Sequence, residues 1–217
     1  MSDLLPSPAP DACLLYLLRH GATDNNVANP PRLQGRLANP GLSVAGRKQV
    51  EHTAGFLAAR KIDAVYTSPL VRARETADIL AQPHGKPVEA IDALIEADLG
   101  DWEGRTWPEI ERDEPEKFHQ FIADPGTHGY GGGENFSQVA ARVVPALEQL
   151  MQAHLGQVVL VVAHNVVNRS VLAHSLGLPM AHARRITQTN CGVNILRYRE
   201  QRMQVLSINS VFHLYEW

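Results

Sequence analysis

Apolar residues along the chain gather in short continuous runs that are separated by amphipathic stretches. The longest runs are CLLYLL at 13–18 and QVVLVVA at 157–163, and a shorter stretch, IDAVYT at 62–67, is mostly apolar. Continuous apolar runs are typical of strands that are covered on both faces, as in a parallel sheet. We therefore predict two buried strands at 13–18 and 157–163, a further strand at 62–67 and a shorter one at 87–91.

The amphipathic stretches 43–60, 68–81, 135–154 and 165–176 predict helices. The first two begin at a serine that can cap a helix, and Pro69 suits the first helical position. Strands that alternate with helices predict an α/β fold, a three-layer sandwich whose mainly parallel central sheet carries helices on both faces.

We expect one domain over residues 13–217, preceded by a flexible leader at 1–12. Residues 24–41 are rich in Asn, Pro and Gly and predict a loop. A less regular stretch at about 97–133, with a short helix in it, predicts a small cap-like insertion. Loose alternation over 192–209 predicts a terminal hairpin at the sheet edge.

Composition narrows the class of protein. The 217 residues have a net charge of −3, so a general nucleic-acid binder is not expected. No run is long enough to span a membrane, and the N-terminus does not read as a signal peptide. Cys13 and Cys191, the only cysteines, predict two unpaired thiols in a reducing cytoplasm.

Polar residues follow three of the predicted strands. Arg19-His20 ends the first, Thr67-Ser68 ends the second with Arg72 one helical turn later, and His164-Asn165 ends the third. Ligands bind outside the carboxyl ends of such strands, and in a parallel sheet these ends converge. Two arginines and two histidines would then surround one point, which predicts a binding site for a phosphoryl group.

Other interpretations fit less well. Each of these residues alone would more often be a surface turn or an ordinary hydrogen-bonded histidine. The chain has neither HxxxH nor HExxH, and a histidine beside an arginine is a poor cation ligand, so we predict no metal and no other cofactor. A generic nucleotide binder would need a GxGxxG or Walker loop, and neither is present.

The segment LLRHGATDNN resembles the RHG motif of the histidine phosphatase superfamily, which includes the cofactor-dependent phosphoglycerate mutases and many small phosphatases. RHG alone is weak, but six further segments resemble family motifs in the same order, over nearly the whole chain. These are LQGR (33–36), NPGLSVAGRKQV (39–50), TSPLVRARETA (67–77), EADLGDWEGRTWPEI (96–110), GGGEN (131–135) and VVAHN (161–165).

The resemblance implies roles for the matching positions. His20 would be the nucleophile that becomes phosphorylated, and Glu96 would protonate the leaving oxygen. Asn165 stands where the family often has glycine or glutamine, but its amide can still donate a hydrogen bond. The remaining implied contacts to the phosphoryl group come from Arg19, Arg72 and His164, with Gly21, Thr23, Asn26, Gln34 and Asn165 around them.

These residue types suit the implied chemistry. Neighbouring arginines disfavour a charged imidazole, which keeps a histidine nucleophile neutral, and they stabilise the charge of the transition state. A phosphohistidine intermediate divides the reaction into two easier steps. Gly21 would let the backbone approach the ligand closely.

The short, acidic stretch after Glu96 resembles the phosphatase branch of the family. We therefore predict a metal-independent phosphomonoesterase of the histidine acid phosphatase type, acting on a small phosphorylated metabolite in the cytoplasm. The alternatives are a phosphoglycerate mutase-type phosphoryl transfer and a non-catalytic phospho-ligand-binding protein. The substrate and the oligomeric state stay open, with a homodimer as one possibility.

Six further side chains have a predicted or an open role. Arg32 and Arg36 would favour a substrate with a second negative group. The pair Arg184-Arg185 is interpreted as a solvated helix end, with a second anion site as the alternative. Trp102 and Trp107 are interpreted as a small cap core, with an apolar wall beside the leaving group as the alternative.

Overall fold

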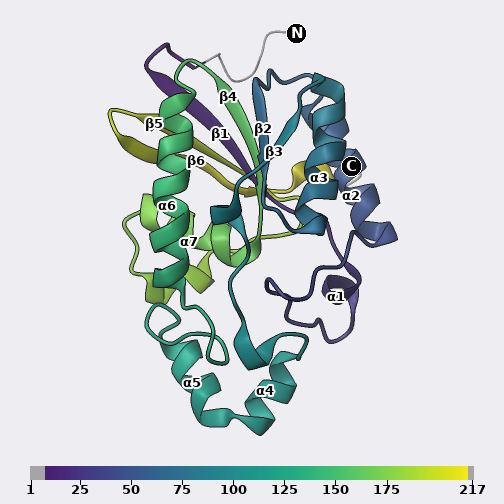
Figure 1. The fold of residues 1–217 in the computed structure, drawn as a ribbon, viewed down its shortest axis with the longest axis vertical. Helices are drawn as coiled ribbons and strands as arrows, with labels where there is room; N and C mark the ends of the chain where they lie inside the picture. The colour runs from purple at the N-terminus through teal and green to yellow at the C-terminus, as the bar shows by residue number, and fades with distance from the viewer. Residues whose placement is uncertain (1–7, 215–217) are drawn as a thin grey trace.

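A six-stranded sheet runs through the centre of the computed structural model, which describes residues 8–214 (Figure 1). The strand order is β3-β2-β4-β1-β5-β6. The first four strands are mutually parallel, and β5 and β6 complete the sheet as an antiparallel hairpin. The strands are β1 Ala12–Arg19, β2 Ala64–Thr67, β3 Val88–Ala90, β4 Val158–Ala163, β5 Val193–Arg199 and β6 Arg202–Ser210.

Helices lie on both sides of this sheet, so the predicted fold class is confirmed. Figure 1 shows α2 and α3 on one side and α6 and α7 on the other. The α-helices are α1 Asp24–Val27, α2 Val44–Leu57, α3 Val71–Ala81, α4 Trp107–Asp113, α5 Pro115–Ala123, α6 Phe136–Ala153 and α7 Asn165–Ser175. Short 3-10 turns lie at Gln82–His84, Asp92–Leu94, Gly100–Trp102, Met180–Arg185 and Phe212–Leu214.

The continuous apolar run of β1 is explained by these two layers. Leu15 and Leu17 belong to the core beneath α6 and α7. Leu14 and Leu18 belong to the core beneath α2 and α3. Because successive side chains of a strand point to opposite faces, a strand between two helical layers must be apolar at every position.

Local details differ from the predictions. The helix expected from Ser68 begins at Val71, because the backbone of Leu70 is still extended. The predicted loop at 24–41 contains the one-turn helix α1. The single helix expected in the insertion is two, since Glu114 leaves the helical region and Pro115 starts a new helix.

The start of the domain and the state of the two cysteines were also predicted from the sequence. Ala12, which was assigned to the predicted leader, belongs to β1, and residues 1–7 of that segment lie outside the described part of the chain. Cys13 and Cys191 are buried and unpaired, as predicted. Among the helices in residues 8–214, none combines the length and apolarity that a membrane span requires.

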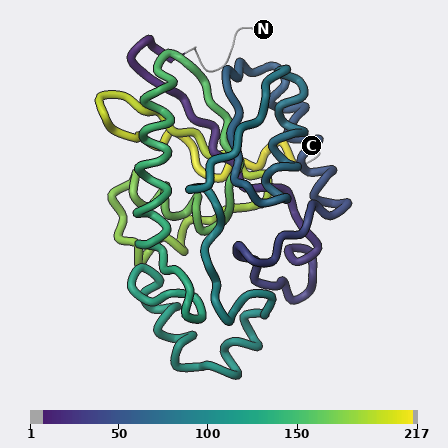
Figure 2. The backbone as a smooth tube through the Cα atoms, viewed as in Figure 1, coloured from purple at the N-terminus to yellow at the C-terminus, as the bar shows by residue number. Residues whose placement is uncertain are grey.

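The loop 24–41 and the insertion that contains α4 and α5 both lie beyond the carboxyl ends of the parallel strands (Figures 1 and 2). Two backbone hydrogen bonds join them, from Leu33 N–H to the Arg105 carbonyl (2.8 Å) and from Gly104 N–H to the Leu33 carbonyl (2.9 Å). These two segments therefore enclose the edge of the sheet at which the predicted site residues lie.

Gly46 holds the start of α2 against the chain segment that follows β1. A Cβ atom at Gly46 would overlap the carbonyl group of Ala22, and one at Gly21 would lie 2.6 Å from the Val50 side chain. Gly55, on the same helix, has open space around it. The two helical glycines thus provide a matched pair for measuring the close approach.

We expect Gly46→Ala to lower the free energy of unfolding by about 1–3 kcal/mol, because the backbone must move to admit the methyl group. Gly55→Ala should raise it by about 0.5–1 kcal/mol through helix propensity alone. Urea denaturation followed by circular dichroism measures both. Equal stability of the two variants would contradict the packing role of Gly46.

Candidate active site

The carboxyl ends of β1, β2 and β4 meet at one edge because these strands are parallel neighbours. The residues that follow them are His20, Ser68 and His164, and all three are buried. The ring centroids of the two histidines are 5.2 Å apart. The convergence predicted from the strand ends is therefore present in the structure.

His20 is 3% exposed, and its tautomer is fixed by the backbone. Its Nδ1 lies 2.7 Å from the Gly21 carbonyl oxygen, an acceptor, so Nδ1 carries the proton and Nε2 carries the lone pair. Burial, reinforced by the charges of Arg72 and Arg19, holds the pKa of His20 well below its ordinary value of 6.5. The imidazole is therefore neutral, with Nε2 available as a nucleophile.

Arg72 is fully buried, and its guanidinium is positioned by backbone carbonyl groups. Its two terminal nitrogens donate to Ala38 (3.1 Å) and Gly35 (2.7 Å), and Nε donates to His20 Nε2 (3.3 Å). Burial lowers its pKa to about 10, so the side chain stays cationic at neutral pH. A group bonded to His20 Nε2 would thus lie beside a fixed cation.

Arg19, which precedes His20, is also held by a backbone carbonyl group. One terminal nitrogen donates to the Gln188 carbonyl at 2.7 Å, and Nε is buried without a partner among the described residues. Burial lowers the pKa of Arg19 to about 10. The side chain keeps its charge and presents an unsatisfied donor close to the nucleophile.

His164 contacts Ser68, which the sequence placed at a converging strand end but to which it assigned no role in the site. His164 Nε2 lies 2.7 Å from Ser68 Oγ, while its Nδ1 is buried with no partner among residues 8–214. Burial and the charge of Arg72 hold the pKa of His164 well below its ordinary value. The position of Ser68 directly after a strand was the available signal, but it was interpreted as a helix cap.

Glu96 is the buried carboxyl group of the site, at 3% exposure. Its two oxygens accept hydrogen bonds from the N–H groups of Ala97 (2.9 Å) and Val166 (3.2 Å). Burial raises its pKa above the ordinary 4.5, although these hydrogen bonds and the nearby arginines oppose the shift. Glu96 is therefore a carboxyl group that can carry a proton.

The smaller polar residues of the prediction divide into two groups. Asn26, Gln34 and Asn165 line the cleft in front of His20, and the Asn165 side-chain oxygen is buried without a partner among the described residues. Gly21 and Thr23 do not line it. Their roles are structural, because Gly21 N–H donates to Thr76 Oγ1 (3.0 Å) and Thr23 Oγ1 donates to Gln34 (2.8 Å).

The structure gives a different reason for glycine at position 21 from the one predicted. A side chain at this position would collide with α2, and the N–H group is already used by Thr76. Close helix packing requires glycine here. Asn190, which no motif pointed to, donates to the His20 carbonyl (2.9 Å) and to Asn26 (3.3 Å), so it connects the nucleophile's backbone to the cleft.

The cleft has a volume of about 300 Å³ and is unbalanced in charge. Its lining contains one carboxyl group, Glu96, and four arginines. Leu99, Trp107 and Tyr130 form an apolar part of the wall. Arg72 and His164 are fully buried beside His20 and do not line the cleft, and the four lining arginines are Arg19, Arg32, Arg169 and Arg184.

These observations correct several interpretations. Arg36 is ion-paired with Asp98 outside the cleft, so it does not await a second anion, whereas Arg32 does line the cleft. Arg184 is not a solvated helix end, because it stacks on Trp107 inside the cleft wall. The two tryptophans have different positions: Trp102 is fully buried in the core, as interpreted, and Trp107 reaches the cleft.

A family model described as histidine phosphatase superfamily (branch 1) matches residues 15–211. The chain belongs to this superfamily. The resemblance drawn from the motif order is thereby confirmed.

Several relatives of the superfamily have names that state an activity. Phosphoserine phosphatase 1 of Hydrogenobacter thermophilus is 32% identical over 94% of this chain and 95% of its own length. Metal-independent phosphoserine phosphatase of Arabidopsis thaliana is 34% identical over 92% and 82%. The solved structure of Bacillus stearothermophilus YhfR, 32% identical, covers 94% of this chain and 100% of its own, with a TM-score of 0.86.

Mutases also occur among the relatives. A probable phosphoglycerate mutase, GpmB of Salmonella choleraesuis, is 28% identical over 87% of this chain and 86% of its own length. The phosphatase relatives described above are more similar. They confirm the prediction of a phosphomonoesterase of the histidine phosphatase type.

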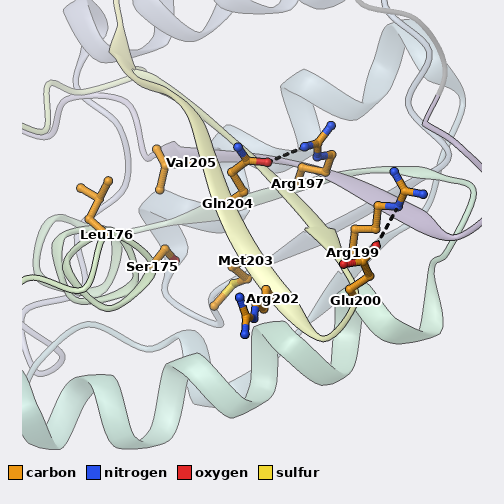
Figure 3. Close-up of a pocket in the computed structure, with 9 residues that line it drawn as sticks. All are labelled: Ser175, Leu176, Arg197, Arg199, Glu200, Arg202, Met203, Gln204 and Val205. Atoms are coloured by element: carbon orange, nitrogen blue, oxygen red, sulfur yellow. Dashed lines mark hydrogen bonds and ion pairs between the residues drawn. The ribbon is translucent and has the colours of Figure 1, made fainter.

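A second pocket of this histidine phosphatase lies at the opposite end of the sheet (Figure 3). Its volume is about 550 Å³, and β5, β6 and the end of α7 line it. Arg199 pairs with Asp11 and Glu200, and Arg197 donates to Gln204. Because Arg199 lies opposite Ala12 at the beginning of β1, this pocket is remote from the nucleophile. Within residues 8–214, no three His, Cys, Asp or Glu side chains are placed to hold a metal ion.

We expect Arg72→Gln to raise the pKa of His20, because it removes the larger of the two charges that disfavour the imidazolium. Titration of the imidazole signals by nuclear magnetic resonance measures the shift. Arg74→Gln, an exposed substitution on the same helix that removes only an ion pair to Asp78, is the control and should leave His20 unchanged. An unaltered His20 titration in Arg72→Gln would show that burial alone keeps the imidazole neutral.

Proposed function

We propose that this protein hydrolyses a small phosphorylated metabolite through a phosphohistidine on His20 Nε2. The observation that supports it best is the fixed tautomer of His20: Nδ1–H faces the Gly21 carbonyl oxygen, and Nε2 faces the guanidinium of Arg72. The lone pair and a cation thus meet where a phosphoryl group would be attacked.

In the first step, His20 Nε2 attacks phosphorus, and the bond between phosphorus and the ester oxygen breaks. Arg19 and Arg72 stabilise the charge on the equatorial oxygens of the phosphoryl group, since both are fixed before the reaction by backbone carbonyls. Glu96 transfers its proton to the leaving oxygen, and the alcohol departs. His164, beside His20, and Asn165, in the lining of the cleft, would contribute further contacts to that group.

In the second step, water attacks the phosphohistidine. Glu96, now ionised, accepts a proton from that water, and the bond between Nε2 and phosphorus breaks. Inorganic phosphate leaves, and the lone pair returns to Nε2. Every proton in this cycle is carried by Glu96 or by the substrates, so the scheme needs no metal ion.

The size of the cleft and the relatives favour a small substrate. A volume of about 300 Å³ is at the lower end of the range of ligand sites. Two relatives are named for phosphoserine, a phosphorylated amino acid. A small phosphorylated acid is accordingly the substrate class we propose, in the cytoplasm, where free thiols such as Cys13 and Cys191 persist.

A mutase is the second candidate, because one relative is named as one. A mutase must hold a doubly phosphorylated intermediate away from water, which calls for free cations over the site. The basic residues of α4, α5 and the turn before them are already paired with carboxylates: Arg105 with Asp113 and Glu114, Arg112 with Asp113, and Lys117 with Glu114. The insertion thus adds no free cation to those of the cleft, and the greater similarity of the named phosphatases than of the mutase also favours hydrolysis. A binding protein would not need both a nucleophile and an acid.

We expect the wild-type protein to hydrolyse para-nitrophenyl phosphate in the presence of EDTA, and His20→Ala to lose at least about a thousandfold in kcat, because the covalent path is removed. His174→Ala, on the exposed surface of α7, is the matched control and should retain full activity. Appreciable turnover by His20→Ala would exclude the phosphohistidine.

We expect Glu96→Gln to slow alkyl phosphates by about 100-fold or more and para-nitrophenyl phosphate far less, because a good leaving group hardly needs a proton. The raised pKa of Glu96 also predicts that alkyl phosphate turnover falls as the pH rises through that pKa, when the acid loses its proton. Steady-state rates across pH measure both effects. Equal losses on the two substrate types would rule out the acid role.

A further inference from the structure

Arg169 and Arg184 are two cleft arginines that the proposed mechanism does not use. Both are half-buried and line the cleft that contains His20. No ion pair to either is found among residues 8–214. Most other arginines away from the phosphoryl position, such as Arg36 and Arg105, do have a carboxylate partner.

Each of the two side chains is positioned by the surrounding structure. Arg169 Nε donates to the Ile186 carbonyl at 2.8 Å, and no described residue accepts a hydrogen bond from its terminal nitrogens. The Arg184 guanidinium lies over the rings of Trp107 (5.3 Å to the centroid) and Phe121 (5.2 Å). Stacking on aromatic faces leaves the donors at the edge of a guanidinium free to bind an anion.

The charges of the two arginines are unfavourable for each other. Burial lowers the pKa of Arg169, and the nearby charge of Arg184 lowers it further. A single carboxyl group, Glu96, lines the same cleft, and it carries a proton at the start of the proposed cycle. An anion between the two guanidinium groups would relieve this repulsion and accept hydrogen bonds from both.

The position of this pair along α7 sets the size of the ligand. Asn165, at the phosphoryl end, and Arg169 are four residues apart, so they lie on one face of the helix with about 5–6 Å between their Cβ atoms. A second anionic group two to four bonds away from the phosphate ester would therefore reach Arg169.

We propose that Arg169 and Arg184 form a carboxylate subsite that selects phosphate monoesters of small hydroxy acids. The assignment rests on the proposed function and names its substrate class. The planar forks of two arginines match the geometry of a carboxylate, and the small cleft leaves room for one further group of that size beside the phosphoryl group. Arg185, the next residue, is exposed and has no part in the subsite.

The test compares matched esters on the wild type and on Arg169→Gln, Arg184→Gln and the control Arg185→Gln. 3-Phosphoglycerate and glycerol 3-phosphate share a carbon skeleton, and the first has a carboxylate where the second has a hydroxymethyl group. Phosphoserine and phosphoethanolamine differ by the presence of the carboxylate. We expect the wild type to prefer the carboxylate esters at least about tenfold in kcat/KM, the range that a charged hydrogen bond supplies.

In Arg169→Gln and Arg184→Gln, the kcat/KM of the carboxylate esters should fall about 10- to 100-fold, mainly through KM, while the matched esters stay within about threefold. Arg185→Gln should match the wild type. Equal losses on both esters, or absence of a carboxylate preference in the wild type, would each overturn the subsite.

Hydrolysis of para-nitrophenyl phosphate separates this inference from the proposed function. Wild-type turnover of that ester without a carboxylate preference would refute only the subsite, whereas its retention by His20→Ala would refute the phosphohistidine mechanism. If Arg169→Gln loses its fold, as judged by thermal denaturation, the Arg184→Gln variant alone tests the subsite. The Arg184 side chain stacks on the cleft wall and makes no hydrogen bond to a described residue, so its replacement should not unfold the protein.

Discussion

The buried charge of Arg72 is the constraint on which the site depends. A cation without a carboxylate in contact is costly to bury, and backbone carbonyls are the means by which the structure satisfies it. Those of Gly35 and Ala38 lie on the loop that follows β1, so this loop must hold its shape against α3. The loop is held in turn by Glu103, which accepts hydrogen bonds from the N–H groups of Gly35 (2.8 Å) and Ala38 (2.9 Å).

This chain of contacts ties three distant segments to one guanidinium. The first β-strand supplies the nucleophile, α3 supplies the cation, and the insertion supplies the carboxylate that fixes the loop between them. The contacts of Glu103 with the loop also hold the insertion across the strand ends (Figure 1). Residues of the insertion form part of the wall of the cleft there. Residues of the insertion are therefore structural parts of the active site as well as a cover for it.

The sequence was informative where the physical signal is local. Continuous apolar runs identified the buried strands, and the residues after them converged because neighbouring strands are parallel. The signal failed where a side chain has a distant partner. Ser68 looks like a helix cap, but its hydroxyl contacts His164, 96 positions away. Arg184 and Arg185 are chemically identical neighbours, and only the tertiary structure places one over Trp107 and the other in solvent.

The same burial acts on the two reactive groups in opposite directions. Desolvation disfavours whichever form is charged, so it lowers the pKa of His20 from 6.5 and raises that of Glu96 from 4.5. The arginines add to the first shift and oppose the second, yet burial is the larger effect on Glu96. Each shift widens the range of pH in which a neutral imidazole and a protonated carboxyl group coexist. That combination is the one that the first step of phosphoryl transfer requires, and it follows from excluding water around two side chains of opposite charge type.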